Sequence, residues 1–141
     1  RAKKTAGIFA KTYKAKKHDI FFRDELYGAY ENVFYDVIAN ASNKFDSIAI
    51  FSHNPGLTDF ANLLTATRID NIPTCGIFAV KAVCDKWKDF KEAKKEFWFF
   101  DYPKNLWYQL DIKSIPKGFV RLSLSKPFES SFDKLRTTVF Y

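Results

Sequence analysis

A histidine at the end of an apolar segment is the residue of this sequence best suited to chemistry. His53 follows the apolar run Ser47–Ser52 and precedes Asn54-Pro55-Gly56, which predicts a tight turn before a helix that starts near Thr58. Ligand sites of open α/β sheets lie at such strand ends, and a nearby helix N-terminus favours an anion such as a phosphoryl group. Imidazole titrates near neutral pH, so a histidine there can hold phosphate, attack it or donate a proton. Alternatively, His53 only caps the strand end by hydrogen bonding.

The other histidine, His18, lies in a Lys-rich turn and is expected at the surface.

Helices and strands around His53 are predicted from the spacing of apolar residues. A helix is expected over 1–13 with Ala2, Ala6, Phe9, Ala10 and Tyr13 on one face, and a second helix over 31–41. The run at 47–52 is typical of a strand buried on both faces of a parallel sheet. Strands are also expected at 77–84 and 96–101, paired antiparallel through the polar segment between them.

Composition favours one globular, soluble, cytoplasmic domain. The chain has 141 residues, is 47% hydrophobic and carries a formal charge of +7 from 23 basic and 16 acidic residues. No apolar run approaches the roughly 18 residues that span a bilayer, so no membrane association is expected. The +7 charge raises nucleic-acid binding as an alternative, but no basic cluster alternates with aromatic residues, so we expect no nucleic-acid partner.

The two cysteines point to no cofactor. Cys75 and Cys84 form neither a CxxC pair nor a cluster with histidines, so we expect reduced thiols and no metal site. Cys75 is expected to be small and buried.

Several segments together resemble the SixA-type phosphohistidine phosphatases of the histidine phosphatase superfamily. Ser52–Ala61 is similar to the family's Gly-His-Asn-Pro-Gly-Leu segment, and Arg1–Ala6 to its Arg-Ala-x-x-Thr-Ala segment. Ile72–Gly76 and Phe99–Lys104 resemble the Pro-Thr-x-Gly loop and the closing strand of the family, in the same order.

The resemblance implies a chemistry. A neutral histidine attacks phosphorus, a covalent phosphohistidine forms, and water releases phosphate without any metal or other cofactor. It implies that His53 and Arg1 are catalytic and bind phosphate, and that Asn54 and Thr74 also line the phosphate site. For Thr74, a role in stabilising its turn is an equal alternative.

The sequence departs from the family pattern at three places. The Arg-His-Gly or Arg-His-Ala motif that carries the nucleophile has no counterpart, so this chain alone is expected not to turn over substrate. Ser52 replaces a glycine, which either narrows the pocket or adds a hydrogen bond. Gly28 stands where mutase-like relatives have a general-acid Glu, which favours phosphohistidine, whose imidazole leaving group needs less acid help, over phosphate monoesters.

Three carboxylates near Gly28, Asp24, Glu25 and Glu31, are either substitute acids or ordinary surface groups.

We therefore predict an α/β fold, a three-layer sandwich with a mainly parallel central sheet that lacks its first strand. Residues 1–106 are expected to form the histidine-phosphatase-like domain, with 107–141 an unassigned C-terminal extension. The expected function is removal of phosphate from phosphohistidine in proteins. The expected partner is a phosphohistidine-bearing protein such as a phosphotransfer domain of a signalling relay, met by a monomer or weak oligomer. The alternative is a non-catalytic module that binds phosphate or phosphoproteins.

Overall fold

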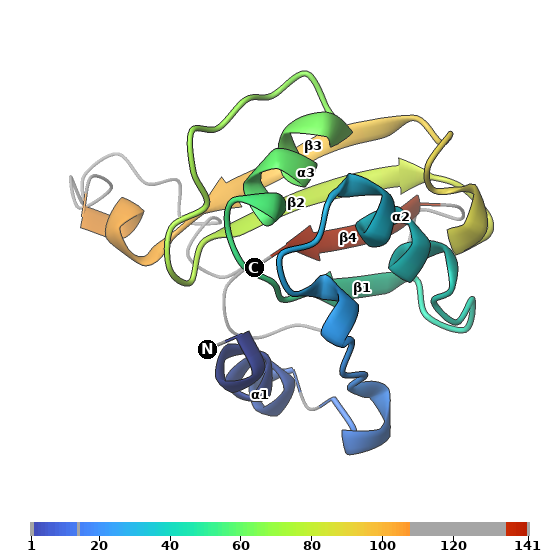
Figure 1. Cartoon of the computed structure of the whole chain (residues 1–141), viewed down its shortest axis with the longest axis horizontal. Helices are drawn as coiled ribbons and strands as arrows, with labels where there is room; N and C mark the ends of the chain where they lie inside the picture. The colour runs from blue at the N-terminus through green and yellow to red at the C-terminus, as the bar shows by residue number, and fades with distance from the viewer. Residues whose placement is uncertain (1, 14, 108–134, 141) are drawn as a thin grey trace, which may run out of the picture.

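The computed structural model describes residues 2–13, 15–107 and 135–140, and it has a mixed α/β fold (Figure 1). The α-helices and strands in these ranges are α1 (Ala2–Thr12), α2 (Glu31–Ala39), β1 (Ser47–Ile50), α3 (Gly56–Leu64), β2 (Ile77–Val83), β3 (Lys95–Asp101) and β4 (Leu135–Phe140). Short 3-10 helices lie at Lys17–Asp19, Asp24–Leu26, Trp87–Asp89 and Pro103–Trp107. The predicted α/β class is confirmed.

The sheet combines both kinds of strand pairing. Its strand order is β1-β4-β2-β3; β1 and β4 are parallel, whereas β2 pairs antiparallel with both β4 and β3. The antiparallel β2–β3 pair follows the sequence expectation, because a short polar connection can join antiparallel neighbours but not parallel ones. We expected a mainly parallel sheet, but the described strands do not form one. Only β1 and β4 pair in parallel among them, whereas β2 pairs antiparallel with β3 and with β4.

Strand β4 comes from the part of the chain that was expected to be a separate extension. It lies between β1 and β2, with Phe140 opposite Ile50 on one side and Phe78 on the other. The last part of the 107–141 segment therefore belongs to the same sheet as the residues before 107, in a central position. Residues 108–134 lie outside the described part of the chain.

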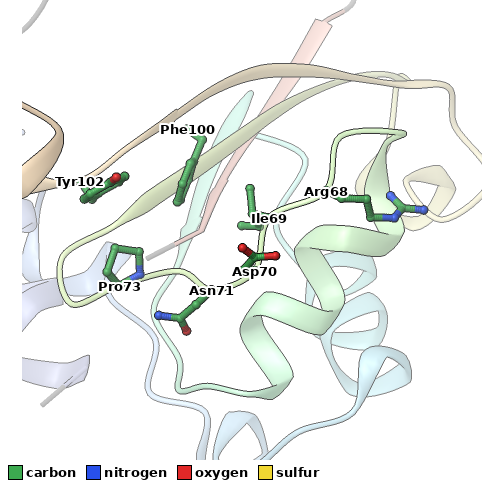
Figure 2. Close-up of a pocket in the computed structure, with 7 residues that line it drawn as sticks. All are labelled: Arg68, Ile69, Asp70, Asn71, Pro73, Phe100 and Tyr102. Atoms are coloured by element: carbon green, nitrogen blue, oxygen red, sulfur yellow. The ribbon is translucent and has the colours of Figure 1, made fainter. Parts of the chain in front are cut away.

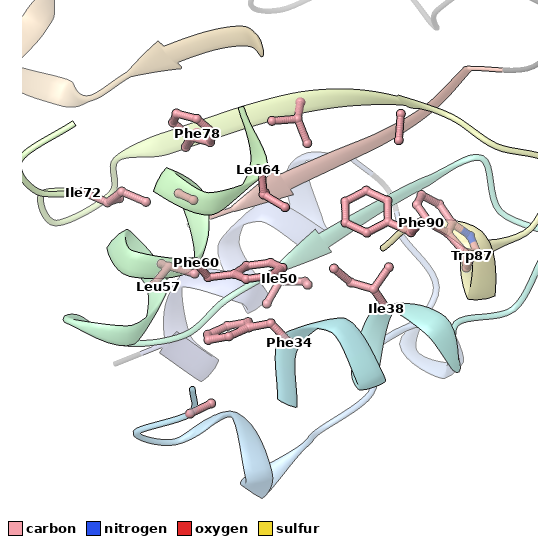
Figure 3. Close-up of a cluster of buried hydrophobic side chains, with 14 residues drawn as sticks. Phe34, Ile38, Ile50, Leu57, Phe60, Leu64, Ile72, Phe78, Trp87 and Phe90 are labelled. Atoms are coloured by element: carbon pink, nitrogen blue, oxygen red, sulfur yellow. The ribbon is translucent and has the colours of Figure 1, made fainter. Parts of the chain in front are cut away.

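One face of the sheet is covered by α2 and α3, and the core lies between them (Figure 3). Phe34 and Ile38 stand one helical turn apart on α2 and are fully buried, because side chains four residues apart share a helix face. Phe34 stacks on Phe60 of α3 with 4.8 Å between ring centroids. Trp87 is also fully buried, and its indole N–H donates to the carbonyl of Phe45 at 2.9 Å. The strand ahead of the candidate histidine is thus held by a dense aromatic core.

Helix α1 differs from α2 and α3 because none of its residues is buried. Its predicted apolar face is only half-buried, and Tyr13 at its end is exposed. Phe9 meets Phe51, just after β1, at 5.7 Å between ring centroids, and Lys3 lies 4.8 Å from the ring centre of Phe22. Among the described residues, α1 therefore adds no side chain to the buried core.

Within the ranges described, no helix has the length and hydropathy needed to cross a membrane.

Candidate functional site

His53 lies in the short connection between β1 and α3. The strand ends at Ile50 and the helix begins at Gly56, so the predicted strand, tight loop and helix are all present. The His53 side chain is half-buried, and its backbone carbonyl accepts a hydrogen bond from the N–H of Leu57 at 3.2 Å. The Asn54–Pro55 peptide bond is cis. This geometry puts an accessible imidazole where a strand end meets a helix start.

The first turn of α3 offers fewer free N–H groups to an anion than the sequence suggests. Leu57 donates to His53 and Asp59 donates to the carbonyl of Pro55 at 3.0 Å, so these two groups are used inside the protein. The helix dipole still favours negative charge at this end. Phosphate held here would rely on side chains more than on the helix backbone.

A second loop, Leu26–Ala29, is fixed against the His53 loop at two points. The Ser52 hydroxyl donates to the carbonyl of Leu26 at 2.6 Å. Gly56 lies so close to the carbonyl oxygen of Ala29 that a Cβ on Gly56 would collide with it. Of the two roles considered for Ser52, the structure shows the added hydrogen bond. The two loops therefore behave as one unit around His53.

Tyr27 lies between those two points, and its ring meets the imidazole of His53 edge to face. The ring centroids are 5.2 Å apart and the planes are inclined by 69°. Sequence reasoning assigned Tyr27 no role. The only signal for it was an aromatic residue directly before Gly28, whose φ of 66° marks a turn.

Asn54 serves to join loops. Its amide donates to the side-chain oxygen of Asn71 at 2.6 Å and to the carbonyl of Ile72 at 2.8 Å. Its side-chain oxygen accepts from the hydroxyl of Thr58 at 2.7 Å, and that hydroxyl in turn accepts from the N–H of Ile72 at 3.0 Å. Asn54 was expected to bind phosphate, but its amide group is hydrogen-bonded within the protein. These bonds hold the α3–β2 loop to the His53 loop.

Thr74 lies in a tight turn closed by a 2.7 Å hydrogen bond from the N–H of Gly76 to the carbonyl of Pro73. Its neighbour Cys75 has a φ of 60° and is exposed, so the expectation of a buried Cys75 is wrong. Cys75 is the third residue of this turn, and its positive φ is that of a type II turn. Its thiol is therefore part of an exposed turn and not of the core. Thr74 is exposed, and turn geometry accounts for it without a ligand.

Two cavities lie beside this turn, and His53 lines neither of them. The larger, of about 410 Å³, is shown in Figure 2 and is lined by Arg68, Ile69, Asp70, Asn71, Pro73, Phe100 and Tyr102. A smaller one of about 320 Å³ is lined by Pro73, Thr74, Tyr102, Pro103 and Lys104. Thr74 therefore lines the smaller of these two cavities, which does not include His53.

The positively charged side chain that lines the larger cavity, Arg68, already has hydrogen-bond partners within the protein. The guanidinium of Arg68 donates to the carbonyls of Thr65 and Thr67, at 2.5 and 3.3 Å, beyond the C-terminal end of α3. Figure 2 shows this side chain pointing away from Asp70. A positive charge near a helix C-terminus is stabilising, so Arg68 has a structural reason to be where it is.

The remaining residues predicted for the site are Arg1 and the three carboxylates near Gly28. Arg1 lies outside the described residues. The carboxylates Asp24, Glu25 and Glu31 are exposed, the first two in a 3-10 helix and the third in the first turn of α2. Among the residues described, no three His, Cys, Asp or Glu side chains are grouped so that they could hold a metal ion.

Burial shifts two pKa values around Phe90. It raises the pKa of the Tyr35 phenol, and the carboxylates of Glu92 and Glu31 act in the same direction. It lowers the pKa of the Lys95 ammonium, against the opposing effects of Glu92 and Cys84. Tyr35 contacts the Phe90 ring and the Lys95 nitrogen lies 4.9 Å from its centre, so both shifts belong to the edge of the core.

In comparisons with known proteins, no family model, no curated protein and no solved structure matches this chain.

Proposed function

We propose that this chain forms the phosphoryl-holding part of a histidine phosphatase that removes phosphate from phosphohistidine in proteins. The observation that carries the proposal is His53, an accessible imidazole at the end of β1, held by two loops whose backbones are locked together. The finer fold belongs to the same proposal: a three-layer arrangement of the histidine phosphatase kind. Its support is the parallel pairing of β1 with β4 beside the helix that follows His53.

The proposed reaction has two displacements. A nucleophilic histidine attacks phosphorus, the bond from phosphorus to the substrate imidazole breaks, and the imidazole leaves with a proton from solvent. Water then attacks the covalent phosphohistidine and releases inorganic phosphate. His53 in its cationic form would hold the phosphoryl oxygens as charge shifts onto them, with Arg1 as the proposed second cation.

The nucleophile must come from elsewhere than this sequence, which contains no Arg-His-Gly or Arg-His-Ala segment. That observation favours a second candidate function: a non-catalytic module that binds phosphorylated proteins through the same site. Gly28 is consistent with either function, because it provides no acid side chain at the position where mutase-like relatives have a general-acid Glu.

A comparison of binding with turnover tests both functions. This chain and the natural protein, including any segment that precedes Arg1, are incubated with a phosphohistidine peptide. We expect the chain to bind the peptide and the natural protein to release phosphate from it. His53→Ala should lower the rate of release roughly 100-fold or more, because it removes a group that holds the transferred phosphoryl.

The matched control is His18→Ala. His18 is the only other histidine and lies exposed in the 3-10 helix Lys17–Asp19, so its loss should change neither binding nor release. Binding that depends on His53 with no release by the natural protein would favour the binding module. Full activity in His53→Ala would contradict both functions.

A further inference from the structure

Tyr27 is the most exposed large hydrophobic side chain in the described part of the protein, although it lies beside the half-buried His53. About 80% of its surface is accessible, while its ring meets the imidazole edge to face. Aromatic rings usually gain stability by burial, so a ring left this exposed contributes little to folding. The exposed part of Tyr27 is therefore available to another molecule.

The backbone on both sides of Tyr27 is held in place. Before it, the carbonyl of Leu26 is bonded to Ser52, and the N–H of Tyr27 itself donates to the carbonyl of Asp24 at 3.0 Å. After it, the backbone of Ala29 is in close contact with Gly56. Figure 1 shows the loop that leads to α2 passing beside the loop from β1 to α3. An exposed ring fixed in this way is preorganised, so binding a ligand against it costs little ordering of the loop.

Next to Tyr27, the described part of the chain leaves open space at Gly28. A Cβ placed on Gly28 would have no heavy atom of these residues within 4 Å, apart from its chain neighbours. In a phosphorylated histidine the imidazole ring is bonded directly to phosphorus. When His53 holds the phosphoryl group, the substrate's imidazole ring therefore lies within a few ångströms of His53. In a phosphorylated serine, phosphorus is bonded to an ester oxygen that leads to a flexible methylene group, so no ring lies there.

We propose that Tyr27, with the open space at Gly28, forms a subsite for the imidazole ring of the substrate and selects phosphohistidine over phosphoserine. The inference rests on the proposed function, because it needs a phosphoryl group at His53. Tyr27 supplies an aromatic surface for the substrate ring, in the offset or edge-to-face arrangements that aromatic pairs prefer.

The experiment measures binding of three probes to the full chain by titration calorimetry. The probes are inorganic phosphate, a peptide with a non-hydrolysable phosphonotriazole mimic of phosphohistidine, and the same peptide with phosphoserine. Tyr27→Ala should weaken the ring-bearing peptide about threefold to tenfold, the effect of one aromatic pair. The other two affinities should be unchanged, and Tyr27→Phe should bind all three probes as the unsubstituted protein does.

The matched control is Tyr30→Ala. Tyr30 also precedes α2, and 78% of its surface is accessible, nearly the same fraction as for Tyr27. This substitution should leave all three affinities unchanged. Equal weakening of all three probes by Tyr27→Ala, or no weakening at all, overturns the subsite while leaving the proposed function intact. If no probe binds the unsubstituted chain, the proposed function fails and the subsite fails with it. Tyr27→Leu, which keeps an apolar side chain but removes the aromatic ring, replaces Tyr27→Ala if that variant does not fold.

Discussion

The region around α2 and α3 and the region around α1 are held in very different ways. Phe34, Ile38 and Phe60 are fully buried between the two helices and the sheet, whereas α1 has no buried residue and meets the end of β1 through Phe9. His53 lies between these regions, since its loop begins at the strand that Phe9 approaches and ends at α3. One side of the site is therefore built on the buried core, whereas the helix on the other side has no buried residue, and we expect local opening to begin there.

The largest effect should come from the core. Phe60→Ala removes a ring that stacks on Phe34 and meets Tyr35 edge to face, so it leaves a cavity. We expect a loss of about 3–5 kcal/mol in the free energy of unfolding. Urea denaturation followed by circular dichroism measures it, and a loss below about 1 kcal/mol would contradict the rigid core described above.

A smaller effect should come from the polar link between the core and the His53 loop. Thr58→Val keeps the shape of this buried side chain but leaves the Asn54 oxygen and the Ile72 N–H without their partner. We expect a loss of about 1–3 kcal/mol in the free energy of unfolding, measured by the same urea denaturation.

Thr12→Val is the matched control in the other region. Thr12 is exposed at the end of α1 and donates only to the carbonyl of Ile8 in its own helix, at 3.0 Å. Its replacement should change stability by less than about 0.5 kcal/mol. Equal losses in the two threonine variants would show that the Asn54–Thr58 link has no special importance.

The smallest effect should come from Phe9→Ala, the counterpart of Phe60→Ala in α1. Because Phe9 is only half-buried, we expect a loss of about 1 kcal/mol or less in global stability. The change should appear instead as faster amide hydrogen exchange confined to Ala2–Thr12, measured by mass spectrometry. A global loss as large as that of Phe60→Ala would mean that α1 is part of the core.

How much could be predicted from the sequence depended on the range of the interactions involved. The helical spacing of Phe34 and Ile38 and the apolar strands on either side of Trp87 are local patterns, and they gave α2, β2, β3 and their antiparallel pairing. The pairing of β4 with β1 joins segments about 90 residues apart, and no local period marks it. The sheet was therefore predicted to be more parallel than its described strands are.

The same distinction applies to the candidate site. His53 was found because a polar residue after a buried strand is visible in the sequence. Tyr27 was missed because only the fold brings its loop to His53, through Ser52 on one side and Gly56 on the other. Asn54 was predicted to bind phosphate, but its hydrogen-bond partners at Asn71 and Ile72 cannot be recognised without the α3–β2 loop in place.

The central position of β4 has a consequence for the order in which this protein can be assembled. Ser47 faces Thr137 in the parallel pair, so β1 acquires this neighbour only after residues 135–140 have left the ribosome. Until then the edges of β1 and β2 that β4 pairs with are open, and such edges attract other chains. Contacts this distant in sequence also make folding slow. A protein shortened before Leu135 would keep both edges permanently open and would be the form most prone to aggregate.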